Sequence, residues 1–274
     1  MGVPGIVIAD TVTKLGADAA GQVAIAASHA GIYAAHVALE AKVAGVVLND
    51  AGIGLDEAGI AGLGYLDTFS VPAAAIDFRS ARIGDGDDSA ARGIISRHNA
   101  AAAELGVRVG MTARQAAEHM RAAPRRSRVL SAHPEEARLA LTVAGAQRPV
   151  WLLDSASLIA EGDVGAVVVT GSHGGLLGGK AATAAKVDVF AAVYNDAGIG
   201  ADRAGVSRLP ALDARGIAAA TVAASSARIG DARSAYETGR LSLVNATAAR
   251  LGAQSGMTTR AFVELVSRIP SQEA

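Results

Sequence analysis

The stretch Asn-Asp-Ala-Gly-Ile-Gly at residues 49–54 returns unchanged at residues 195–200. Ser-Ala-Arg-Ile-Gly-Asp, which starts at Ser80 and again at Ser226, keeps the same spacing of 146 residues. Nearer the amino terminus the spacing is 144 residues, as in the Ser-His pairs at residues 28–29 and 172–173. A repeat that covers most of a chain is typical of a protein made of two similar units. We therefore predict two similar lobes, related by a pseudo-two-fold axis, with a ligand cleft between them.

Each copy alternates short apolar runs with alanine-rich stretches. The apolar runs start near residues 6, 23, 45 and 72 in the first copy, and near residues 150, 166, 189 and 217 in the second. Apolar strands that alternate with helices predict a mainly parallel sheet covered on both faces. The expected fold class is therefore α/β, internally duplicated, with a small, mainly parallel sheet flanked by helices in each lobe.

The repeat also sets the predicted boundaries: residues 1–120 form the first α/β repeat and residues 149–274 the second. Residues 121–148 have no counterpart and connect the two. In that segment Pro134 precedes two glutamates, which is typical of a helix start, so we expect a short helix from there to about Val143. Within the repeats we expect helices at residues 32–43 and 177–187, 89–105 and 234–251, and 112–120 and 258–267.

Composition excludes several classes of function. The 274 residues carry a net charge of −1, so no overall field recruits nucleic acid or a membrane surface. The absence of cysteine excludes disulfides, thiolate zinc sites and a cysteine nucleophile. No signal peptide and no membrane-length apolar segment is recognisable, so we expect a cytoplasmic protein. The alanine-rich helices favour close packing between chains, so we expect a homo-oligomer.

In open parallel sheets ligands bind beyond the carboxyl ends of the strands, so the loops that follow the apolar runs are the candidate site. The glycine-rich loop at residues 171–175 is the first choice. There Ser172 is the candidate nucleophile and His173 the candidate base, while the backbone N–H groups of Gly174 and Gly175 would bind substrate or a developing oxyanion. The alternative is that Ser172 caps a helix and His173 packs locally.

The two Ser-His loops differ. The second copy has extra glycines and Lys180, where the first copy has His36. If there is one active site, this difference points to residues 172–180, with the first copy supplying the opposite wall. His29 and Lys180 are then alternative bases, and Ser28 is a candidate for substrate binding.

Two other repeated loops add polar candidates. Asn49, Asp50 and Asn195 would bind substrate, and Asp196 would orient the base. Capping of the next helix is the alternative for these loops. Arg82 and Arg228 would bind a substrate carboxylate, or would pair internally with a nearby aspartate.

We therefore predict a cofactor-independent hydrolase of a small polar or anionic metabolite, acting on an amide, cyclic amide or ester in the cleft between the repeats. Two alternatives stay open. A divalent metal held by the His/Asp set, His29, Asp50, His173 and Asp196, would make the protein a metal-dependent hydrolase or lyase. The same cleft would also suit a non-enzymatic small-molecule binding protein.

Overall fold

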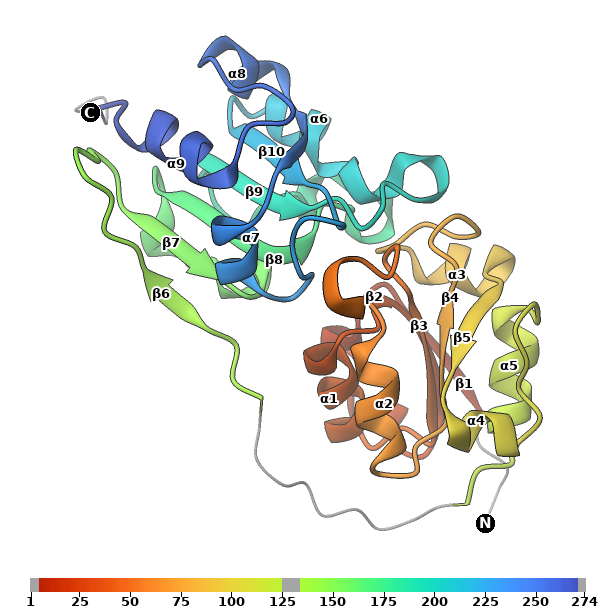
Figure 1. The fold of residues 1–274 in the computed structure, drawn as a ribbon. Coiled ribbons are helices and arrows are strands. Elements are labelled where there is room, and N and C mark those ends of the chain that lie inside the picture. The colour runs from red at the N-terminus through yellow and green to blue at the C-terminus, as the bar shows by residue number, and fades with distance from the viewer. Residues whose placement is uncertain (1–4, 125–133, 271–274) are drawn as a thin grey trace.

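The computed structural model describes residues 5–124 and 134–270 and contains two β-sheets, each flanked by helices (Figure 1). We call residues 5–124 the N-terminal lobe and residues 134–270 the C-terminal lobe. The expected α/β class is confirmed.

The N-terminal lobe holds a five-stranded sheet whose strands lie side by side in chain order. The first four strands are parallel and the fifth is antiparallel. The strands are β1 (Ile6–Ala9), β2 (Val23–His29), β3 (Gly45–Asn49), β4 (Ala73–Ile76) and β5 (Ile95–His98). The α-helices are α1 (Ile32–Glu40), α2 (Ala61–Asp67), α3 (Gly86–Arg92), α4 (Ala100–Glu104) and α5 (Ala113–Met120). Short 3-10 helices are η1 (Val12–Lys14), η2 (Ala17–Ala19) and η3 (Leu55–Glu57).

The C-terminal lobe holds a six-stranded sheet, again in chain order, with parallel pairing in the middle and an antiparallel strand at each edge. The strands are β6 (Arg138–Ala140), β7 (Val150–Leu153), β8 (Val167–His173), β9 (Ala191–Asn195), β10 (Ala218–Val222) and β11 (Leu241–Val244). The α-helices are α6 (Arg208–Asp213), α7 (Ala232–Glu237), α8 (Ala246–Arg250) and α9 (Thr259–Ser267). The 3-10 helices are η4 (Ala156–Leu158), η5 (Glu161–Asp163), η6 (Leu177–Gly179), η7 (Ala181–Thr183) and η8 (Ala201–Val206).

Strand β2 shows why an uninterrupted apolar run folds here. Side chains alternate between the two faces of a strand. Ala24 and Ala26 pack into the core that contains α1 and α2, whereas Val23 and Ile25 pack into the core that contains α3 and α5. Both faces of the sheet are therefore buried, as in other parallel sheets.

Two predicted helices are interrupted by strands. The segments expected as helices at residues 89–105 and 234–251 contain β5 and β11 between short helices. The break follows Gly93 and Gly239, where an added Cβ would collide with the carbonyl oxygen of the preceding helix. The chain then turns again at Asn99 and Asn245, whose side chains cap α4 and α8. Sequence periodicity alone does not separate two short helices and the strand between them from one long helix.

The predicted helix at residues 177–187 is also absent. The chain forms η6 and η7 there, whereas the matching segment of the first copy forms α1. Gly178 and Gly179 have φ values of 57° and 67°, which a right-handed helix does not allow. Gly178 and Gly179, which follow the candidate loop at residues 171–175, therefore prevent the expected helix.

The expected short helix in the connecting segment is wrong. Residues 138–140 form β6, which pairs antiparallel with β7. Three hydrogen bonds hold this segment extended: the Ala137 N–H donates to Asp154 at 2.8 Å, and the Arg138 guanidinium binds both oxygens of buried Asp163 at 2.7 and 3.0 Å. Residues 125–133 of the predicted connecting segment lie outside the described residues.

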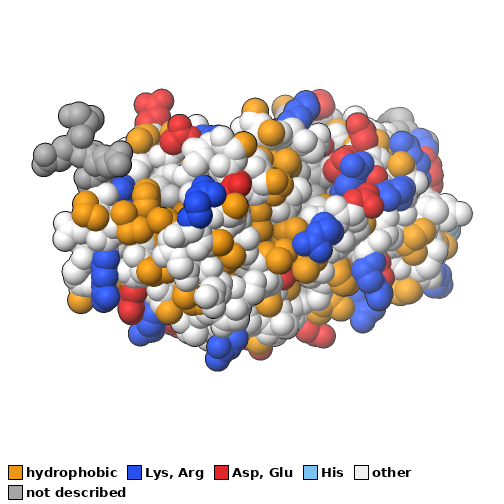
Figure 2. Space-filling view, turned by 90° about the horizontal axis from the view of Figure 1, so that it is seen from above, with side chains coloured by type: hydrophobic (Ala, Val, Ile, Leu, Met, Phe, Trp, Pro, Cys, Tyr) orange, Lys and Arg blue, Asp and Glu red, His pale blue; other side chains and the backbone are white. Residues whose placement is uncertain are grey.

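The distribution of charged side chains on the surface agrees with the near-zero net charge. Figure 2 shows one face, on which basic and acidic side chains are interspersed with hydrophobic and uncharged ones. This face has no extended basic patch of the kind that binds nucleic acid. Within residues 5–124 and 134–270, no helix combines the length and the hydrophobicity needed to cross a membrane.

Candidate active site

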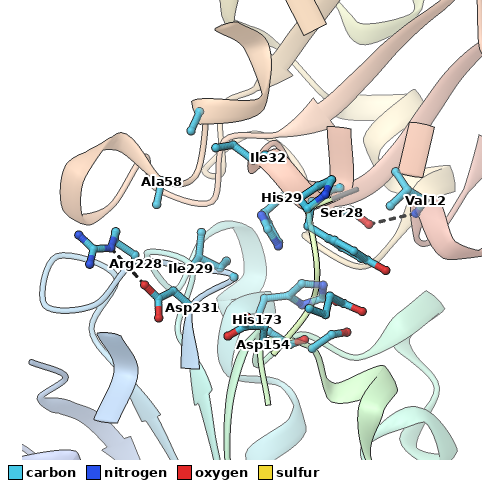
Figure 3. Close-up of a pocket in the computed structure, with 18 of the residues that line it drawn as sticks. Val12, Ser28, His29, Ile32, Ala58, Asp154, His173, Arg228, Ile229 and Asp231 are labelled. Carbon is cyan, nitrogen blue, oxygen red and sulfur yellow. Dashed lines mark hydrogen bonds and ion pairs between the residues drawn. The ribbon is translucent and has the colours of Figure 1, made fainter. Parts of the chain in front are cut away.

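A pocket of about 440 Å³ lies between the two lobes (Figure 3). This size suits a small organic ligand. Part of its wall is apolar and consists of Val12, Ile32, Ala34, Ala58, Ala61 and Ile229. The polar and charged lining consists of Thr11, Thr13, Ser28, His29, Tyr33, Asp56, Glu135, Glu136, Asp154, Ser155, Ser172, His173, Arg228 and Asp231.

Two histidines that end matching strands meet in this pocket. His29 is the last residue of β2 and His173 the last of β8. Figure 3 shows His29 reaching in from the N-terminal lobe and His173 from the C-terminal lobe. The Gly31 N–H donates to His29 Nδ1 and the Gly175 N–H to His173 Nδ1, both at 3.1 Å. An Nδ1 that accepts a hydrogen bond carries no proton, so each neutral ring has its proton on Nε2.

Burial keeps both rings neutral. Desolvation lowers the pKa of His29 to about 4. The pKa of His173 lies well below its usual range, because burial and the positive charge of Arg208 disfavour the imidazolium form. Neither Nε2 has a hydrogen-bond partner among the described residues. Each ring therefore offers an N–H donor to the pocket, and this geometry favours hydrogen-bond donation over the predicted role of His173 as a base.

We expect these two histidines to make the protein sensitive to mild acid. In the unfolded chain they bind protons near their ordinary pKa of 6.5, whereas folded His29 does so only near pH 4. The unfolded state then binds more protons between these values, so stability falls as the pH falls through that window. For His29 the free energy of unfolding should drop by on the order of 1 kcal/mol between pH 7 and 5.5, and His173 should act in the same direction. Urea denaturation of the wild type and of the His29→Asn/His173→Asn variant checks this, and equal slopes against pH would contradict it.

The two pocket serines are held by backbone donors. Ser172 Oγ accepts the Ala156 N–H at 2.9 Å, and Ser28 Oγ accepts the Val12 N–H at 3.0 Å. Successive side chains of a strand point to opposite sides, and within the described part of the chain no hydrogen bond joins Ser172 to His173. Ser172 therefore lines the pocket without the adjacent base that a serine nucleophile needs.

The two repeated arginines form ion pairs within the protein. Arg228 lies at the pocket, where its Nη1 is 2.6 Å from Asp56 Oδ2 of the other lobe and its Nε is 3.3 Å from Asp231 Oδ2. Arg82 does not line this pocket and binds Asp88 at 3.1 Å. Internal pairing, the alternative expected from the sequence, is what both arginines show.

The glycine-rich loop after β8 does not form the expected anion cradle. The Gly174 N–H donates to Asn195 O at 2.8 Å, and the Gly175 N–H is bound to His173. Lys180 is exposed and lies in a separate depression of about 450 Å³ that also includes Asp10 and Arg82. Of the predicted residues at 172–180, only Ser172 and His173 reach the pocket between the lobes.

The loops at residues 49–54 and 195–200 have a structural role. Residues 51–54 all have positive φ, including Ile53 at 63°, a conformation rare for a β-branched residue. Asn49 Oδ1 accepts the Ala51 N–H at 2.9 Å, and Asp50 Oδ1 accepts the Gly52 N–H at 3.1 Å. Asn195 and Asp196 make the same bonds in the second loop, both at 2.9 Å. These four polar side chains stabilise left-handed turns, and none of them lines the pocket.

The two left-handed turns contact each other where the lobes meet. An added Cβ on Gly52 would lie 3.0 Å from Gly198 Cα, so the backbones are in van der Waals contact. Around them Ala51, Ala197 and Ile229 belong to one small buried apolar cluster. The predicted substrate-binding role of Asn49, Asp50 and Asn195 is thus replaced by a role in the lobe interface.

Three residues that shape the site were not expected from the sequence. Tyr33 and Glu136 line the pocket, and burial raises the pKa of the Glu136 carboxyl, an effect that the Tyr33 and Ser155 hydroxyls partly offset. Buried Arg208 holds the loop after β8 by donating to Gly175 O at 3.0 Å. Arg208 and Tyr33 both differ from their counterparts in the other copy, Gly62 and Leu177, and this difference was their only signal in the sequence. Glu136 lies outside the repeat, in the segment expected to be helical.

The predicted His/Asp metal site does not assemble. Asp50 and Asp196 lie at the lobe interface, away from the pocket that holds His29 and His173. Each histidine carries its proton on the Nε2 that would have to bind the metal. Among the described residues, no group of three or more His, Cys, Asp or Glu side chains is arranged to hold a metal ion. The donor set therefore does not fit a divalent metal.

The structure thus brings five of the predicted residues together in one pocket: Ser28, His29, Ser172, His173 and Arg228. The pocket combines two neutral N–H donors with several hydroxyl groups and an excess of carboxyl groups, so it can both donate hydrogen bonds to a ligand and accept them from it. Comparison of the chain with models of known protein families, with curated proteins and with solved structures finds no match.

Proposed function

We propose that this protein is a cofactor-independent hydrolase that binds a small polar amide, cyclic amide or ester in the pocket between its lobes. The observation that carries the proposal is the pair of neutral histidines, each fixed by a backbone N–H at Nδ1 and directing Nε2–H to the same pocket. Two such donors can share one carbonyl oxygen, which accepts two hydrogen bonds.

The chemistry would use these donors as an oxyanion hole. Water attacks the carbonyl carbon, and the charge that develops on the carbonyl oxygen is stabilised by His29 and His173. Glu136 is the pocket carboxyl suited to take the proton from that water, because its raised pKa makes it a stronger base than an exposed glutamate. It then returns the proton to the leaving amine or alcohol, so that the C–N or C–O bond breaks and Glu136 is restored.

We also infer that the lobes arose by internal duplication and are related by a pseudo-two-fold axis. The support comes from reciprocal contacts across the interface. The Leu55 N–H donates to Ala224 O and the Ala201 N–H to Phe78 O, both at 2.8 Å. Residues 55 and 201, like residues 78 and 224, are 146 positions apart in the chain. Reciprocal contacts between matching residues are what a two-fold axis produces.

A small-molecule binding protein without catalysis is the second candidate. The observation that favours it is the state of the hydroxyl groups, because Ser28 and Ser172 accept backbone N–H groups and contact no base. Such a protein would use the histidine donors for affinity alone.

A screen of small amides, cyclic amides and esters tests the proposal, with thermal shift to detect binding and product analysis to detect hydrolysis, both with and without a chelator. We expect Ser172→Ala to lower turnover by less than about tenfold, because Ser172 lacks a base, whereas loss of a serine nucleophile costs about 10⁶-fold. Binding without turnover would favour the second candidate. A loss of turnover by several orders of magnitude in Ser172→Ala would restore Ser172 as the nucleophile.

A further inference from the structure

The pocket has an excess of negative charge. Its described lining includes five carboxyl groups, Asp56, Glu135, Glu136, Asp154 and Asp231, and a single guanidinium, that of Arg228. Burial keeps both histidines neutral, so they do not offset this charge. A cleft lined by one sign of charge attracts ligands of the opposite sign. This balance argues against the anionic substrate expected from the two arginines.

The guanidinium of Arg228, the one cation in the described lining of the pocket, is already paired. Arg228 lies 2.6 Å from Asp56 and 3.3 Å from Asp231, so it compensates those two carboxylates. Asp154 has no ion-pair partner among the described residues, and its two oxygens accept the N–H groups of Ala137 and Ala232 at 2.8 and 2.9 Å. These bonds fix the carboxylate in place and leave its charge uncompensated.

A second observation also points to a missing ligand. His173 is only 7% exposed, yet its Nε2 has no hydrogen-bond partner among the described residues. Most of the ring is buried and the residue lines the pocket, so this donor is available to an acceptor group of a ligand. In Figure 3 Asp154 lies on the same side of the pocket as His173, the side formed by the C-terminal lobe. The unpaired donor and the uncompensated carboxylate thus belong to one site.

We propose that the substrate is cationic: a small amide or ester that carries an ammonium group, with its carbonyl oxygen on His29 and His173 and its ammonium beside Asp154. This inference rests on the proposed function, because it assigns the carbonyl to the same donors. An amino amide or an amino ester combines both groups within the span of a small pocket. Apolar side chains such as Ile32 and Ile229 line the remaining wall and suit a short hydrocarbon chain.

Three amides of similar size test the charge preference: β-alaninamide, which is cationic, butyramide, which is neutral, and succinamate, which is anionic. At low salt we expect β-alaninamide to bind on the order of tenfold more tightly than butyramide, and succinamate to bind most weakly. Salt screens interactions between partly exposed charges, so the preference should shrink at 0.5 M NaCl. Isothermal titration calorimetry on the full chain measures all three.

Variants that each change the charge of the pocket by one unit test the same preference. Glu135→Gln should reduce the preference for β-alaninamide over butyramide by about threefold and Arg228→Gln should raise it by a similar factor, because each changes the pocket by one charge. Glu161→Gln, at an exposed position outside the pocket, is the control and should change nothing. If butyramide binds as tightly as β-alaninamide at low salt, the inference is wrong while the proposed function stands. If no amide or ester of any charge binds, the proposed function fails as well.

Discussion

Asp196→Ala should lower the free energy of unfolding by about 2–3 kcal/mol, because two backbone donors lose their acceptor. Asp196 Oδ1 accepts the Gly198 N–H and the Ala224 N–H, both at 2.9 Å. Asp196 is only 4% exposed and Ala224 only 6%, so water does not readily replace the carboxylate. Chemical denaturation followed by circular dichroism measures the change.

The effect should extend to the pocket. Ala224 O accepts the Leu55 N–H from the other lobe at 2.8 Å, so the loop that Asp196 holds is also a contact between the lobes. When that loop is released, the two histidines lose their fixed relative position. We therefore expect Asp196→Ala to weaken ligand binding even though Asp196 lies outside the pocket.

Asp196→Asn is the matched control. Asparagine keeps an oxygen at the Oδ1 position, so both backbone donors retain their acceptor, and stability should stay within about 1 kcal/mol of the wild type. The same variant separates the structural role from the catalytic role expected from the sequence, in which Asp196 orients a base. Wild-type stability combined with a large loss of turnover in Asp196→Asn would support the catalytic role instead.

The residues repeated in the sequence have a structural role. Residues retained in both copies, such as Asn49 and Asn195, stabilise turns with several positive φ values, and the turns meet at the lobe interface. The identity of these residues in both copies indicated that they are constrained. It did not show that the constraint comes from folding. The apolar runs were more direct signals, because a buried parallel strand needs an uninterrupted run, and β2, β3, β8 and β9 lie within or close to the predicted runs.

Other features had no local signal. Lys180 lies outside the pocket because Gly178 and Gly179 have positive φ values, which turn the chain away from it. Glu136 reaches the site from the connecting segment, and its position depends on how β6 pairs with β7. Long-range pairing of this kind is set by tertiary contacts that sequence periodicity does not encode. The cytoplasmic location and the homo-oligomer stay predictions from the sequence.

The tautomer of the histidines was the least predictable feature, because it is set by backbone N–H groups two residues later in the chain. The sequence suggested a base beside a nucleophile, whereas the backbone geometry indicates two donors. A donor has a different dependence on pH from a base. Turnover should therefore show no histidine limb between pH 5.5 and 8, because burial holds the pKa of His29 near 4 and that of His173 well below its usual range.

His173→Asn should lower kcat by about 10²–10³-fold on the amide or ester identified by the screen, the loss expected when one oxyanion-hole donor is removed. Asparagine places an oxygen near the position of Nδ1, so it can still accept the Gly175 N–H and keep the loop folded. It has no donor at the position of Nε2. The variant therefore removes the proposed catalytic bond and retains the structural one.

His173→Gln makes the opposite change and completes the test. The longer amide can place an N–H donor near the position of Nε2 but leaves the Gly175 N–H without its acceptor. We expect it to recover at least tenfold of the turnover lost in His173→Asn while being the less stable of the two, and the same pair at His29 should behave alike. Steady-state kinetics and urea denaturation separate the two effects. If His173→Asn retains wild-type kcat, or if His173→Gln is no more active than His173→Asn, then Nε2–H does not stabilise the transition state and the proposed oxyanion hole is wrong.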